Sequence, residues 1–128
     1  MVKNELKGKA FLNCLLKYET EINEKTAELA YWKEQSALQG NEMLAEDIRM
    51  RELELQNLIA SMTEKKLTAT RLIDSMTDPV GRAVLRRRYI LCDTWAKIAS
   101  ACGRMSERNA HYIHDQALLD FEKIYCGG

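Results

Sequence analysis

Apolar and polar positions alternate with helical spacing from the start of the chain. Between Asn4 and Leu38, apolar or aromatic residues recur at intervals of three, four and seven. This spacing predicts a helix with one apolar face, interrupted at Lys25 and backed by a face rich in glutamate and lysine. The apolar face consists of Phe11, Leu15, Tyr18, Ile22, Leu29 and Trp32.

A break and a second helix of the same kind follow. In Gln39-Gly40-Asn41, the glycine suits the position just past a helix end and Asn41 can cap the next helix. The second apolar face is interrupted near Arg51 or Glu52 and again at Lys66. Its members are Leu44, Ile48, Leu55, Ile59, Met62, Ala69, Ile73 and Met76.

Two helices of about 35 residues, each ~52 Å long at about 1.5 Å per residue, joined by a short turn predict a long antiparallel hairpin. This coiled-coil-like arm would span residues 1–77. Two helices bury little surface, so the apolar faces require either folding back onto the C-terminal residues or a second copy. We favour a homodimer through residues 4–76. A single hairpin with a loose core is the alternative.

Residues 78–128 read as a separate small domain of short helices. Asp78 is a good N-cap and Pro79 suits the first position of a helix over residues 79–91. Thr94 can cap a helix from Trp95 to Cys102, Gly103 ends it, and Ser106 can cap a last helix. The positions available for burial are Val84, Leu85, Tyr89, Ile90, Trp95, Ile98, Ala99, Cys102, Ala110, Ile113, Ala117, Leu118 and Phe121.

Two short helices joined by a tight glycine-containing turn describe a helix-turn-helix. The small side chains of Ala99 and Ala110 permit close approach, and the outer face of the last helix is left free for a major groove. On that face lie Glu107, Arg108, His111, Tyr112 and Asp115. Phosphate contacts are expected from Arg86, Arg87, Arg88 and Lys97. Arg104 and Ser106 complete the predicted DNA-binding set, whereas Trp95, Tyr89 and His114 are expected to be packing residues.

Composition agrees with an all-α protein, since only one proline and six glycines are present. No apolar run approaches the ~20 residues that span a bilayer. The N-terminal residues do not resemble a secretory signal, so we expect a cytoplasmic protein. Net charge is zero, but residues 1–78 carry 11 Lys/Arg against 14 Asp/Glu, and residues 79–128 carry 8 against 5. This asymmetry is typical of a nucleic-acid-binding part joined to an assembly part.

The four cysteines do not form a CxxC pair and are expected to be free thiols or small apolar residues. A zinc site from Cys92, Cys102, His111 and His114 can be written down. We do not favour it, because structural zinc sites usually take their ligands as close pairs from turns. No cofactor or metal is therefore expected. No phosphate-binding glycine loop or nucleophile–base pair is present in the sequence, so an enzyme is not expected.

A set of short motifs lies within about residues 78–121, namely Leu85-Arg86-Arg87-Arg88-Tyr89-Ile90, Thr94-Trp95-Ala96-Lys97-Ile98-Ala99, Ser106-Glu107-Arg108, His114 and Ala117-Leu118. In these motifs the second domain resembles the fourth conserved region of bacterial sigma factors. It is especially similar to small phage and prophage proteins that place such a domain behind a helical arm. The chain departs from their pattern at Arg104-Met105, which lengthens the turn by one residue, and in the acidic Glu107, Asp115 and Asp120.

The resemblance implies a phage-type transcriptional regulator related to activators of late-gene expression. Ser106 would then cap the recognition helix, and Arg108 and His111 would face DNA. We therefore expect a dimer that binds double-stranded DNA in a bacterial host, with RNA polymerase as a possible further partner. The alternative is a protein-interaction or assembly factor, such as a small terminase subunit or an RNA-polymerase-binding protein.

Overall fold

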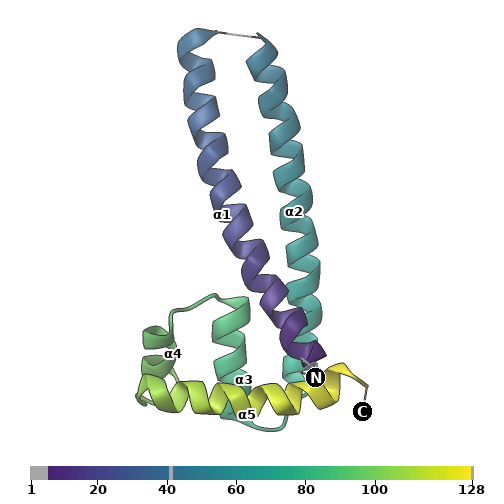
Figure 1. The fold of residues 1–128 in the computed structure, drawn as a ribbon, viewed down its shortest axis with the longest axis vertical. Coiled ribbons are helices and arrows are strands. Elements are labelled where there is room, and N and C mark those ends of the chain that lie inside the picture. Colours follow the sequence, from purple (N-terminus) through teal and green to yellow (C-terminus); the bar gives the residue numbers. More distant parts are fainter. Residues whose placement is uncertain (1–5, 41, 128) are drawn as a thin grey trace, which may run out of the picture. The chain divides into compact units, whose positions relative to one another are not determined.

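The computed structural model describes residues 6–40 and 42–127, and all regular structure in them is helical (Figure 1). The all-α class is therefore confirmed. No helix in the described ranges is long and apolar enough to cross a membrane. The elements are α1 (Lys7–Gln39), α2 (Glu42–Asp74), α3 (Pro79–Leu85), the π-helical segment η1 (Arg86–Ile90), α4 (Trp95–Ala101) and α5 (Glu107–Tyr125).

The chain divides into two compact units whose boundaries fall inside the long helices. Unit 1 joins the residues up to Leu16 to those from Lys65 onward, and unit 2 comprises residues 17–64. Each unit therefore contains a part of α1 and a part of α2. The functional division between residues 77 and 78 stays a prediction.

In unit 2, α1 and α2 run antiparallel. The hydroxyl oxygens of Tyr18 and Ser61 lie 3.4 Å apart. Lys33 lies further along α1, and its ammonium pairs at 3.0 Å with the carboxylate of Glu52, which lies earlier on α2. The seam between the helices buries Ile22, Leu29, Ile48 and Leu55. All four belong to the predicted apolar faces.

One position of the predicted seam in α2 is wrong. Ile59 is 39% exposed, and its neighbour Leu58 packs against the seam instead. The predicted end of the first helix is correct, since Gly40 has φ +60° and donates from its N–H to the carbonyl of Ser36 at 2.9 Å. This left-handed conformation is typical of a helix C-terminus. The expected cap at Asn41 lies outside the described residues.

In unit 1, the segments of α1 and α2 pack on the C-terminal helices. Folding back onto the C-terminal residues, one of the two routes open from the sequence, therefore occurs here. The shared core of unit 1 consists of Leu12, Leu15, Ala69, Ile73, Met76, Leu85, Tyr89, Ala117, Leu118 and Phe121.

The start of α1 is held by a residue of α5. The Glu122 carboxylate accepts hydrogen bonds from the backbone N–H groups of Lys7 at 3.0 Å and Gly8 at 2.7 Å. These N–H groups have no partner within the helix, so the carboxylate replaces a local cap. Hydrogen bonds from the Cys126 thiol and then from Gly8 keep the pKa of Glu122 below its usual value.

The three predicted caps of the short helices are confirmed. Asp78 accepts from the N–H groups of Val80 and Gly81, Thr94 from that of Lys97, and Ser106 from that of Asn109. Pro79 is the first residue of α3. The local chemistry of each cap therefore fixes where α3, α4 and α5 begin.

The single α-helix expected over residues 79–91 is wrong in its second half. From Arg86 the helix widens into the π-helical turn η1, in which the N–H of Leu91 donates to the carbonyl of Arg86 at 3.1 Å. The carbonyl of Ile90 at its end accepts from the Lys66 ammonium at 3.0 Å. Lys66, the polar interruption of the second apolar face, thus stabilises the end of η1. A wider turn of this kind is rare and often lies at a functional site.

Candidate nucleic-acid interface

The helices α4 and α5 meet through small and branched apolar side chains. Ile98 of α4 and Ala110 of α5 are fully buried beside Ala99 and Val84, the latter from α3. The packing partners predicted for this corner, Ala99, Ala110 and Ile113, belong to one cluster. Small residues at the contact let the two helix backbones approach closely.

The turn between α4 and α5 uses two successive left-handed residues. Gly103 has φ +110° and Arg104 has φ +55°. The N–H of Met105 donates to the carbonyl of Ala99 at 3.0 Å, and the Met105 side chain packs on the α4–α5 cluster. The extra residue of the turn is thus accommodated by Arg104 in a conformation that costs about 1–2 kcal/mol for a side chain other than glycine. The Arg104 side chain is exposed.

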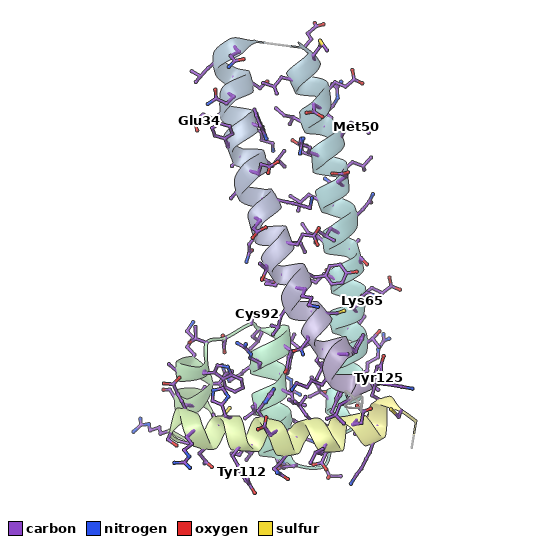
Figure 2. All side chains as sticks on the ribbon, viewed as in Figure 1. Glu34, Met50, Lys65, Cys92, Tyr112 and Tyr125 are labelled. Carbon is purple, nitrogen blue, oxygen red and sulfur yellow. The ribbon has the colours of Figure 1, made fainter. Side chains whose placement is uncertain are left out.

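The side of α5 opposite to its buried face is open to solvent over the whole helix. Its N-terminal half exposes all the groove-facing positions that the sequence predicted, namely Glu107, Arg108, His111, Tyr112 and Asp115. Tyr112 is 62% exposed and points away from α3 and α4 (Figure 2). Leu119, two turns further on, is 49% exposed.

The indole of Trp95 contacts a guanidinium and an imidazole. The guanidinium carbon of Arg88 lies 5.0 Å from the centroid of the indole, and the ring centroid of His111 lies 3.8 Å from it. These contacts join η1, α4 and α5. They also hold His111 against the flank of α4, so its orientation is fixed by packing and not by solvent.

The arginine run of η1 is engaged within the protein. Arg86 pairs with Asp74 at 2.9 Å, and Arg87 pairs with Asp93 at 3.1 Å. Arg88 covers Trp95. All three were predicted to contact phosphates. Arg86 and Arg87 each have a carboxylate partner that competes for their N–H donors, whereas Arg88 lies over the indole ring.

Three other predicted basic residues are exposed and differ from this run. Within the described ranges, Lys97, Arg104 and Arg108 make no ion pair. They lie on α4, in the turn and on α5 respectively. Among the predicted basic residues in the described ranges, these three therefore have neither an ion pair nor a ring contact.

A buried polar network fixes α5 against η1. The Tyr89 hydroxyl lies 2.7 Å from His114 Nε2, and His114 Nδ1 lies 3.1 Å from a carboxylate oxygen of Asp115. The carboxylate can only accept, so Nδ1 carries the proton and Nε2 accepts from the Tyr89 hydroxyl when the ring is neutral.

Burial sets the charge states of this pair. It lowers the pKa of His114 below its usual value of 6.5, against the opposing effect of Asp115. It also raises the pKa of Tyr89 to about 12. His114 is 7% exposed, so it is the packed histidine that the sequence suggested. The Tyr89 partner was not foreseen, because the two residues are far apart in the chain.

No group of three or more histidine, cysteine, aspartate or glutamate residues in the described ranges is arranged to hold a metal ion. In particular, the four residues of the conceivable zinc site do not form such a group. His111 stacks on Trp95 and His114 bonds Tyr89 instead.

Comparisons with models of protein families, with curated proteins and with solved structures found no match to this chain.

Proposed function

We propose that the chain is a dimeric DNA-binding transcriptional regulator of phage type, which acts in the cytoplasm of a bacterial host. In this proposal α5 is a recognition helix that enters the major groove of double-stranded DNA. The observation that carries the proposal is the two-sided character of the N-terminal half of α5. Ala110 and His114 are buried against the neighbouring helices, while Arg108 and Tyr112 are exposed on the other side.

The dimensions of α5 suit this role. A helix with its side chains is about 10–12 Å across, and the major groove is about 12 Å wide. The residues nearest the start of a recognition helix contact base edges. Arg108 therefore occupies a position from which a bidentate contact to guanine is expected, and Tyr112 follows one turn later on the same face.

Phosphate contacts would surround this helix. Lys97 and Arg104 are exposed and without a carboxylate partner among the described residues, which suits charge neutralisation of the DNA backbone. Glu107 and Asp115 lie among them and oppose non-specific attraction. We therefore expect moderate affinity for random DNA and a preference for particular base pairs.

Exposed apolar residues on the long helices support a dimer. The buried seam of unit 2 consists of Ile22, Leu29, Ile48 and Leu55. On α2, Met50 and Leu53 are 61% and 54% exposed. A second copy would cover such residues, in line with the homodimer expected through residues 4–76.

The proposal is tested by two variants that each remove one exposed positive charge of α5. Arg108→Ala is expected to relax sequence preference at one base pair and to cost about 1–3 kcal/mol on the preferred site. Lys123→Ala, near the other end of the helix, is the matched control and should leave sequence preference unchanged. Equal effects of the two variants on preferred and random duplexes would contradict a recognition role for α5.

A second candidate function is a protein-interaction or assembly factor, for which RNA polymerase or a packaging enzyme would be the partner. It is favoured by Tyr112 and Leu119, which form an exposed apolar pair on one face of α5. Such a pair suits a protein surface as well as a thymine methyl group. Measurements of duplex binding distinguish this function from the DNA-binding regulator, because an assembly factor would bind random and selected duplexes equally weakly. A ring of many subunits in a mass measurement would favour a small-terminase-like role.

A further inference from the structure

The flank of α4 carries an open hollow next to the end of η1. The hollow has a volume of about 290 Å³ and is lined by Arg87, Asp93, Lys97, Ser100 and Ala101. Two cationic side chains and a hydroxyl thus face one shallow space. Donors of these types at one position are what a phosphate oxyanion requires.

Asp93 is the acidic residue among the five residues that line the hollow. It accepts from the Arg87 guanidinium at 3.1 Å and its side chain is only 15% exposed, whereas that of Arg87 is 38% exposed. The backbone N–H of Asp93 also donates to the carbonyl of Arg87 at 2.8 Å. The position of Asp93 is therefore fixed by the backbone as well as by the ion pair. Its negative charge stays at the hollow whether or not an anion is present.

We propose that this hollow binds one phosphate group of the DNA backbone through Lys97, Ser100 and Arg87, and that Asp93 weakens this contact. This inference rests on the proposed function. It adds that the charge of Asp93 lowers the affinity of the same interface for DNA. Asp93 acts in two ways. It occupies guanidinium donors of Arg87, and it repels the phosphate by its own charge.

The repulsion lowers affinity for every duplex. Phosphate contacts contribute equally at every DNA sequence, whereas contacts of α5 to base edges do not. A repulsion at a phosphate site therefore weakens binding to random and preferred duplexes by the same factor. Removing the charge should tighten binding to all duplexes by the same factor and leave the ratio of affinities between preferred and random duplexes unchanged.

The test uses the full chain with Asp93→Asn, which keeps the shape of the side chain and an oxygen that accepts from Arg87. A unit charge about 6 Å from a phosphate in water changes affinity about threefold. We expect Asp93→Asn to bind a fluorescent duplex of random sequence about threefold or more tightly at low salt. The slope of log K against log salt should steepen by up to about 0.9, because the phosphate in the hollow is neutralised more completely once the Asp93 charge is removed.

Asp74→Asn is the matched control, because Asp74 pairs with the neighbouring Arg86 at 2.9 Å and does not line the hollow. It changes net charge by the same amount and should affect binding less than Asp93→Asn does. Lys97→Ala should weaken binding to every duplex and remove most of the gain when combined with Asp93→Asn. Equal gains from Asp93→Asn and Asp74→Asn, or an unchanged affinity with Asp93→Asn, would overturn the proposal.

A titration with inorganic phosphate separates failure of the hollow from failure of the proposed function. Backbone amide resonances of Lys97 and Ser100 should shift in NMR spectra, at lower phosphate concentration in Asp93→Asn than in the parent chain. If no variant binds any duplex but these shifts occur, the DNA-binding function is wrong and the anion site stands. If duplexes bind but these amides do not respond to phosphate, the hollow is not the phosphate site.

Discussion

Gly8, near the start of α1, offers a sharp test of packing in unit 1. A Cβ atom at this position would lie 2.8 Å from Cδ1 of Phe121 and 3.1 Å from both Cε1 of the same ring and a carboxylate oxygen of Glu122. Phe121 is fully buried, so its ring has no free space into which to move. The substitution Gly8→Ala therefore has two opposing effects on the free energy of unfolding.

The first effect favours alanine, since replacing glycine inside a helix gains about 1 kcal/mol in helix propensity. The gain is smaller at Gly8 because the residue is second in α1. The second effect is overpacking of a filled core, which costs about 1–3 kcal/mol. A shift of Glu122 would also weaken its hydrogen bonds to the N–H groups of Lys7 and Gly8. We expect a net loss of about 1–3 kcal/mol.

Urea denaturation followed by circular dichroism measures this loss. Ala10→Gly is the control, because Ala10 is exposed on the same turn of α1 and its replacement reports the propensity difference alone. In a Phe121→Leu background, which removes the ring atoms that the new Cβ meets, Gly8→Ala should cost much less. Gly8→Ala that is more stable than the parent chain would refute the packing of α1 on α5 described here.

Three further predictions concern the buried network and the dimer. Tyr89→Phe removes the donor to His114 Nε2 and should cost about 1–3 kcal/mol of unfolding free energy in urea at neutral pH; an unchanged value would show that the hydrogen bond is absent. Burial lowers the pKa of His114 in the folded state, so the unfolded chain binds the proton at a higher pH than the folded chain does. The contribution of this residue to the free energy of unfolding should therefore be complete above about pH 6.5 and be lost as the pH is lowered through the folded pKa. His114→Gln should flatten that pH dependence, and an unaltered slope would assign it to other groups. If the proposed dimer forms through this face of α2, Met50→Glu with Leu53→Glu should convert it to a monomer in light scattering, whereas persistence of a dimer would exclude this face of α2.

The boundaries of the helices could be predicted from local chemistry. Asp78, Thr94 and Ser106 each cap the helix that follows, and such caps depend only on residues within one turn. The apolar faces of α1 and α2 were also readable, because burial follows the helical period. Where two neighbouring residues are both apolar, the helical period does not decide which of them is buried. For this reason the pattern predicts Ile59 in the seam, whereas Leu58 packs there in the structure.

Features that depend on distant partners could not be predicted. The π-helical turn η1 ends where Lys66 of α2 bonds the Ile90 carbonyl, and the sequence shows no sign of this pairing. The arginine run was readable as positive charge, but its ion pairs with Asp74 and Asp93 were not. These partners matter for function, since they determine which cations remain available to a phosphate.

Whether α5 reads DNA is tested by selection of bound fragments from a pool of random double-stranded DNA by the full chain, with the mass of the complex measured on the same sample. A recognition helix at α5 predicts enrichment of a defined sequence, two protomers for each bound fragment, and affinity that falls steeply with salt. Arg108→Ala should alter the enriched sequence at one base pair. Recovery of fragments with no common sequence, or no retention of DNA at low salt, would contradict the account.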